Sequence, residues 1–151
     1  MEIVVVLRFF LIIFILFSSN SRAEKSNNEN NYKTVTVANF NNVIWSFSFI
    51  NKNEILVSLR KGDLYYFNIL TNEKIKLNIP KVEEYGQGGL LDIHLKNIDG
   101  TKYIYYTFSE KLDGLVTTSL ARGIYQTKAI SEVETLFSAK TDSDKKQHFG
   151  S

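Results

Sequence analysis

Hydrophobic and polar residues alternate along much of the chain after residue 40, and a period of two is typical of half-buried β-strands. In the first run, Trp45, Phe47 and Phe49 lie on one face of the expected strand and two serines on the other. Polar turn sequences separate four such runs, at 43–49, 54–59, 64–69 and 75–79. Four short strands joined in this way predict one blade of a β-propeller or a β-meander.

A second set of four strand-like runs follows a glycine-rich stretch. These runs cover residues 90–95, 103–108, 116–125 and 133–137, with aspartate-glycine pairs at 99–100 and 113–114 in the turns between them. The two sets are not alike in sequence, so the repeat is one of architecture. Helical periodicity is weak outside the N-terminal segment, and the sequence therefore predicts an all-β fold.

The N-terminal segment is interpreted as a secretory signal peptide over residues 1–23. Residues 4–17 are apolar except for Arg8, which is shorter than the ~20 residues of a membrane-spanning helix. Small residues at Ser21 and Ala23 fit a cleavage site after Ala23, and the alternative is an uncleaved membrane anchor. The interpretation predicts a periplasmic or secreted protein, no stable membrane anchor after cleavage, a disordered spacer over 24–39 and a folded domain over 40–151.

Composition and charge narrow the classes of partner. The chain has 18 Lys plus Arg against 16 Asp plus Glu, and no cysteine. No basic stripe stands out, which argues against a nucleic-acid partner and favours a small or neutral one. Without cysteine, neither disulfides nor thiolate metal sites are available, so stability depends on burial of apolar side chains.

The stretch Gly86-Gln87-Gly88-Gly89 lies between the two strand sets. Glycines allow a sharp turn and a close approach to a ligand, and the Gln87 amide offers both a donor and an acceptor. A flexible loop between strands is the alternative. No Lys-Ser/Thr pair follows and no helix is expected there, so the stretch is not a phosphate-binding loop.

The two histidines have different candidate roles. His148 follows a polar stretch, and a neutral imidazole near physiological pH is suited to accept a proton from a sugar hydroxyl. The alternative is a surface histidine near a frayed end. His94 lies in the run 91–95 and is interpreted as structural, because no further residues are placed to complete a metal site with it.

Arg60 and a set of aromatic residues each have two possible interpretations. Arg60 ends a strand run, where it either faces the central channel of a propeller or lies in a solvated turn. The aromatic residues suggest either a platform for stacking a sugar or core packing between blades, and core packing is favoured. They are Trp45, Phe47, Phe49, Tyr65, Tyr66, Phe67, Tyr103, Tyr105 and Tyr106.

Three stretches resemble the soluble aldose sugar dehydrogenases that depend on pyrroloquinoline quinone (PQQ), the glucose/sorbosone dehydrogenase family. They are residues 44–49 with 56–64, the glycine-rich stretch 86–92, and His148-Phe149-Gly150-Ser151. The resemblance covers residues 40–151. It implies a six-bladed β-propeller, of which about the first two four-stranded blades are present in this chain.

The resemblance also implies a chemistry. In the family, PQQ lies over the central channel beside a calcium ion, and an aldose is oxidised at its anomeric hydroxyl to a lactone. By this similarity Gln87 hydrogen-bonds the cofactor and His148 takes the proton from the anomeric hydroxyl. Gln147 departs from the family, which often carries an acidic residue before the histidine.

The family's calcium ligands and most of its cofactor contacts lie beyond Ser151. We therefore expect a truncated N-terminal portion that is inactive alone and binds neither PQQ nor calcium tightly. The alternative is a non-catalytic, exported β-propeller-like protein that binds a sugar or a partner. Open blade edges also allow self-association, because unpaired sheet edges invite it.

Overall fold

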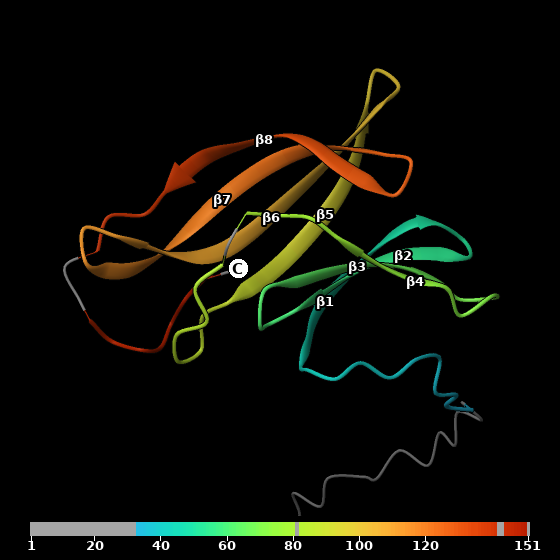
Figure 1. Ribbon diagram of the computed structural model, residues 1–151, viewed down its shortest axis with the longest axis horizontal. Coiled ribbons are helices and arrows are strands. Elements are labelled where there is room, and N and C mark those ends of the chain that lie inside the picture. The colour runs from blue at the N-terminus through green and yellow to red at the C-terminus, as the bar shows by residue number, and fades with distance from the viewer. Residues whose placement is uncertain (1–32, 81, 142–143, 151) are drawn as a thin grey trace, which may run out of the picture. The chain divides into compact units, whose positions relative to one another are not determined.

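The computed structural model describes residues 33–80, 82–141 and 144–150, and this part of the chain is all-β (Figure 1). It contains two four-stranded sheets, one made by strands β1 to β4 and the other by β5 to β8. Their bounds are β1 Ile44–Asn51, β2 Glu54–Leu59, β3 Asp63–Asn68, β4 Lys74–Leu77, β5 Leu90–Ile98, β6 Thr101–Leu112, β7 Leu115–Gln126 and β8 Ala129–Ser138. The predicted all-β class, the two sets and the order of the eight strands are confirmed.

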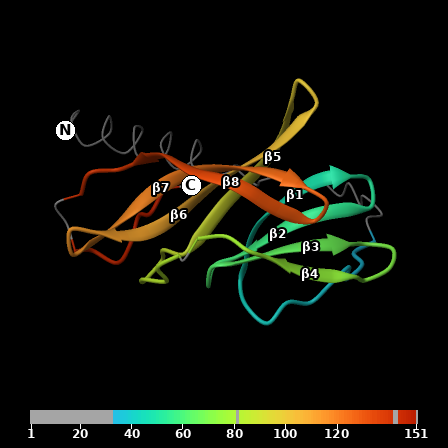
Figure 2. The ribbon, with the colours of Figure 1, turned by 45° about the horizontal axis from the view of Figure 1, so that its top comes forward.

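Each sheet is an antiparallel meander in which every strand pairs with the next one along the chain (Figure 2). The strands of the second sheet extend further than predicted, because the turns that join them are tight. The turn residues Asp99 and Gly100 have φ of 49° and 84°, and Asp113 and Gly114 have φ of 49° and 88°. Positive φ at both central residues is the hairpin geometry that aspartate-glycine pairs favour, so pairing continues up to the turn.

A hydrophobic core lies between the two sheets. Leu56 and Tyr66 of the first sheet and Ile104 and Tyr106 of the second are each at most 1% exposed. The same core includes Leu64, Leu77, Val82, Leu90, Ile93, Phe108, Ala121 and Tyr125. One continuous apolar layer therefore holds the sheets face to face, as in neighbouring propeller blades.

Serine side chains add polar links across this interface. The Ser58 hydroxyl donates to the Leu91 carbonyl at 2.8 Å, and the Leu95 amide donates to the Ser48 hydroxyl at 3.0 Å. The Ser46 hydroxyl donates to the Asp92 carboxylate. The serine face of β1 is thus turned towards the second sheet, and its aromatic face is turned away from it.

The outer face of the first sheet is only partly covered. Ala38 and Phe40 pack on Val57, Leu59 and Phe67, so the packed segment begins before the predicted boundary at residue 40. Core packing is correct for Tyr66, Phe67 and Tyr106 but wrong for the aromatic residues of β1. Their exposed fractions are 38% for Trp45, 57% for Phe47 and 59% for Phe49.

Residues 36–151 form one compact unit. Residues 33–35, the described end of the preceding unit, carry no helix or strand. The predicted signal peptide over 1–23 and the spacer up to residue 32 lie outside the described residues. No helix long and apolar enough to cross a membrane occurs in the described part of the chain.

Candidate functional site

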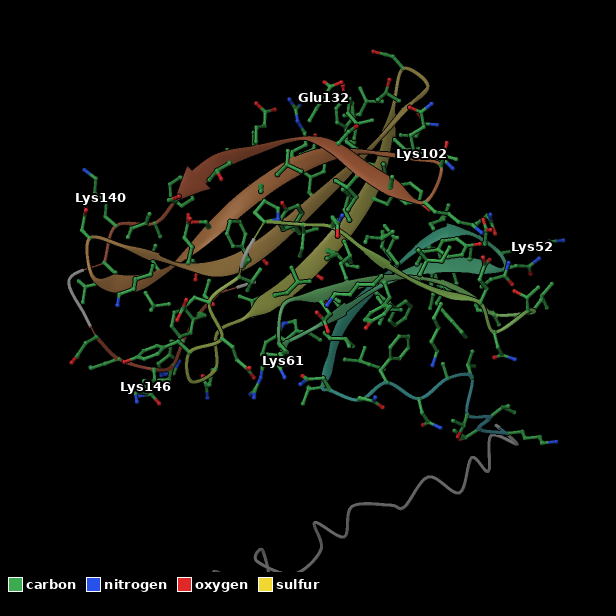
Figure 3. The ribbon with its side chains drawn as sticks, in the orientation of Figure 1. Lys52, Lys61, Lys102, Glu132, Lys140 and Lys146 are labelled. Atoms are coloured by element: carbon green, nitrogen blue, oxygen red, sulfur yellow. The ribbon has the colours of Figure 1, made fainter. Side chains whose placement is uncertain are left out.

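Two sequence motifs that are far apart in the chain meet at one end of the sheets. The first is the glycine turn, residues 85–89, which immediately precedes β5, and the second is the His148 loop, residues 144–150, which follows β8. The His148 amide donates a hydrogen bond to Oε1 of Gln87 at 3.1 Å. The backbone amide of Gln87 donates to the Lys146 carbonyl at 2.9 Å, and Figure 3 labels Lys146 on this loop. The structure thus brings together the two site residues that the sequence predicts.

The glycines of the turn allow close approach, as expected, but what approaches is backbone of the same chain. A Cβ atom on Gly86, which has φ of +60°, would lie 2.1 Å from the Lys146 carbonyl oxygen. A Cβ atom on Gly89, with φ of +150°, would lie 1.9 Å from the Arg60 carbonyl oxygen. Neither position accommodates a side chain, because such distances are far inside van der Waals contact and both φ values are disfavoured for other residues.

The glycine turn is tied to both sheets. The Leu90 amide donates to the Arg60 carbonyl at 3.0 Å, which links the turn to the end of β2. The Ser109 amide, on β6, donates to the Gly89 carbonyl at 2.9 Å, and the Glu83 amide donates to the Ser109 carbonyl at 2.8 Å. Because Gly89 and Ser109 are buried, these bonds make the turn part of the folded unit.

Tyr85 makes two further contacts with the His148 loop. Its hydroxyl donates to the Asp144 carbonyl at 3.2 Å, and the Lys146 ammonium lies 5.1 Å from the centre of its ring. Sequence reasoning missed Tyr85, Asp144 and Lys146. The tyrosine directly before Gly86 was the available signal, but tyrosine is common in this chain and nothing in its spacing indicates a partner near residue 146.

His148 itself is exposed, and its backbone is in the left-handed region with φ of +65°. It lines a cavity of about 410 Å³ between the start of β7, the end of β8 and the His148 loop. Among the described residues, the lining includes the cations Lys140 and Lys145. The lining residues are Val116, Thr117, Thr118, Ala139, Lys140, Thr141, Lys145, Gln147, His148 and Phe149.

Arg60 is expected from the sequence either to face the central channel of a propeller or to lie in a solvated turn, and its side chain is only partly exposed. Its side chain is 33% exposed, and its guanidinium is 3.5 Å from the Glu84 carboxylate. Its Nε atom is buried and has no hydrogen-bond partner among the described residues. Arg60 therefore borders the glycine turn through both its carbonyl and its side chain.

The remaining candidates lie elsewhere. His94 is exposed on β5 and pairs with Tyr105 of β6, alternating with Ile93 and Leu95, which belong to the core. Burial raises the pKa of Tyr106 and of Tyr125 to about 12, and both belong to the core between the sheets. Among the described residues, no group of three or more His, Asp or Glu side chains is arranged to hold a metal ion.

A sequence profile of the glucose/sorbosone dehydrogenase family matches residues 41–151. Three solved structures resemble the chain at 16–24% identity, with TM-scores of 0.57 to 0.61. Two are described as glucose dehydrogenases, and the third as an oxidoreductase (glucose dehydrogenase) from Thermus thermophilus. A search of curated proteins found no match.

The similarity covers 62%, 73% and 71% of this chain but 29%, 35% and 32% of the respective solved chains. The chain therefore spans about a third of their length. At these identities the likeness shows the β-propeller fold, with the two sheets of this chain as blades.

Proposed function

The chain belongs to the glucose/sorbosone dehydrogenase family, and on that premise we propose that it supplies the first two blades of a PQQ-dependent aldose dehydrogenase. The proposed reaction oxidises the anomeric hydroxyl of an aldose to a lactone. The observation that carries the proposal is the contact between Gln87 and His148, 3.1 Å from side chain to backbone. It supports the proposal because Gln87 and His148, which come from two separate motifs, are in contact and both exposed.

His148 is the proposed general base. An imidazole that is neutral near physiological pH can accept the proton of the anomeric hydroxyl as the C–H bond breaks. The His148 side chain is open to solvent, so a sugar can reach it without displacing a packed side chain. The Gln87 amide is the proposed contact to the cofactor, and its donor end is not used in the bond to the His148 backbone.

The groups present suit a quinone cofactor in chemical type. PQQ carries oxygen acceptors and carboxylates, and this site offers an amide with a donor end and a neighbouring lysine-lined cavity. When bound, PQQ supplies the hydride acceptor. The share of this chain is to orient the cofactor edge and to hold the base beside the sugar.

The described residues do not fit calcium. This ion takes six to eight oxygen ligands, and no acidic cluster occurs among the described residues. We therefore assign no step of the reaction to calcium in this chain. We also propose export to the periplasm or beyond, on the pattern of residues 1–23 alone.

One observation favours a second candidate, a non-catalytic protein that binds another β-sheet or a second copy of itself. Phe47 and Phe49 are more than half exposed beside an apolar groove of about 210 Å³ on the outer face of the first sheet. Such a surface is typical of an interaction site. Light scattering over a range of concentrations tests it, and a monomer at all concentrations contradicts self-association.

The experiment for the main proposal joins residues 24–150 to the remaining blades of a solved relative. With PQQ and calcium added, an aldose should reduce an artificial dye and give a lactone. Residues 24–150 alone should give no sugar-dependent dye reduction, and turnover by them would contradict the division of labour proposed here. A fused protein that folds and binds PQQ but oxidises no aldose would contradict the proposed function.

A further inference from the structure

The backbone of His148 has a conformation that needs support. A φ of +65° is uncommon for a residue with a Cβ atom. His148 is exposed, so burial does not hold it in place. The hydrogen bond that its own amide donates is a contact that can support this conformation.

That hydrogen bond ends on Gln87, which contacts the His148 loop twice. Its side-chain Oε1 accepts from the His148 amide at 3.1 Å, while its backbone amide donates to the Lys146 carbonyl at 2.9 Å. The two bonds bracket residue 147 and fix the loop on both sides of it. Only a side chain with a hydrogen-bond acceptor at the same distance from the backbone can replace Gln87 in the contact with the His148 amide, and glutamate is the nearest substitute.

Gly86 makes this arrangement possible. The Lys146 carbonyl occupies the place where a Cβ atom of residue 86 would be, 2.1 Å from its ideal position. Any side chain at residue 86 must therefore push the Lys146 carbonyl away and break its bond to the Gln87 amide. Gly100 is a natural comparison, because its φ of +84° is also positive while nothing lies within 4 Å of its ideal Cβ position.

The supporting partner is itself bonded to both sheets. The glycine turn is bonded to the end of β2 and to β6 through Arg60 and Ser109. The two sheets therefore hold the glycine turn, and the glycine turn holds the His148 loop.

We propose that Gln87 is a positioning residue for His148, and that Gly86 is the residue that allows Gln87 to reach it. The inference rests on the proposed function, in which His148 is the base. It gives Gln87 a second role besides contact with the cofactor. Loss of its side chain should lower turnover through a misplaced imidazole as well as weaken PQQ binding.

The test is amide exchange of His148 by NMR in the ¹⁵N-labelled chain, without cofactor or sugar. Gln87→Ala should speed exchange of this amide about twofold to tenfold, the factor that corresponds to one hydrogen bond. Gln87→Glu keeps the acceptor and should restore exchange to within about twofold of the original. Unchanged exchange in Gln87→Ala, or no rescue by Gln87→Glu, would overturn the proposal.

A glycine pair provides the matched control. Gly86→Ala and Gly100→Ala introduce the same strain at a positive φ, but only the first collides with Lys146. Gly86→Ala should speed exchange at His148 at least as much as Gln87→Ala, and Gly100→Ala should leave it unchanged. Equal effects of the two would contradict the proposal.

If Gly86→Ala does not fold, the Gln87 variants decide alone, since the Gln87 side chain is exposed. None of these readouts uses sugar or PQQ. The two failures are therefore distinguishable, because amide exchange tests the contact between Gln87 and His148 and dye reduction tests sugar oxidation.

Discussion

The interface between the two sheets and the contact between the glycine turn and the His148 loop are held by different forces. Between the sheets, side chains such as Leu56 and Ile104 are fully buried. At the site, Gln87 and His148 are both exposed, and the contact consists of polar bonds to backbone groups. Burial of apolar area dominates the free energy of folding, whereas one exposed hydrogen bond contributes about 1 kcal/mol.

Stability and site geometry are therefore separable in this molecule. Substitutions between the sheets should change the free energy of unfolding and leave the native His148 loop in place. Substitutions in the glycine turn should move the loop at a small cost in stability. Urea unfolding and the His148 amide signal, measured on the same variants, test this separation.

The largest expected loss of stability follows Leu56→Ala. Leu56 is 0% exposed in the core between the sheets, so the variant loses transfer free energy and leaves a cavity. The free energy of unfolding should fall by about 2–5 kcal/mol. The His148 amide shift in the folded variant should stay at its original position, and a shift as large as that of Gln87→Ala would break the comparison.

Ser58→Ala should cost less, about 1–3 kcal/mol. Its hydroxyl is buried, donates to the Leu91 carbonyl at 2.8 Å and accepts from the Ser46 amide at 3.0 Å. Removal leaves the buried Leu91 carbonyl and the partly buried Ser46 amide without this partner, which carries a desolvation penalty. Ser48→Ala at the same interface is a useful comparison, because the Ser48 hydroxyl is only partly buried. A cost for Ser48→Ala greater than that for Ser58→Ala would contradict the account.

Tyr66→Phe should remove about 0.5–1.5 kcal/mol at pH 7. The hydrogen bond from the Tyr66 hydroxyl lowers the pKa of Glu54 below its ordinary value of 4.5. A carboxyl with a lowered folded-state pKa stabilises the fold above its unfolded pKa, and this contribution disappears as the pH falls through the folded-state pKa.

The difference in unfolding free energy between the original protein and Tyr66→Phe should therefore shrink as the pH is lowered from 7 to below 4. A difference that grows on acidification would contradict this assignment. The His148 amide should not respond to the Tyr66 substitution at pH 7.

The smallest effect is expected for Lys128→Met. Lys128 joins the β7–β8 turn to Glu73 of the first sheet at 2.8 Å and lies 4.5 Å from the centre of the Tyr66 ring. Exposed ion pairs contribute little to stability and are screened by salt. A loss of stability in 0.5 M salt as large as that of Ser58→Ala would show that this link holds the sheets together as the core does.

The sequence was sufficient to predict the strands because alternation and polar turns are local signals. It was not sufficient to predict which face of β1 packs inward. Ser46 and Ser48 face the second sheet, and the choice depends on partners, Asp92 and the Leu95 amide, that are distant in the chain. The sequence also did not predict the bulge between Leu90 and Ile93, which brings Leu90 onto the core face.

At the site, sequence motifs indicated Gln87 and His148 but not how they meet. Every residue except proline has a backbone amide that can donate, so the identity of residue 148 does not indicate that its amide bonds to Gln87. The left-handed backbone at residue 148 is equally hidden, because histidine adopts positive φ more often than most residues but in only a small share of cases. Gly86 gave a partial signal, since a glycine beside a candidate residue indicates close approach without naming what approaches.

The most direct test of the central claim is turnover in the protein completed with the remaining blades of a relative, comparing His148→Ala with His94→Ala. Both histidines are exposed, but only His148 lies at the site. His148→Ala should lower sugar-dependent turnover by about 100-fold to 10,000-fold, the usual contribution of a positioned base, with PQQ affinity nearly unchanged. His94→Ala should have turnover close to that of the unmodified protein. Near-normal turnover in His148→Ala would contradict the account at its most important residue.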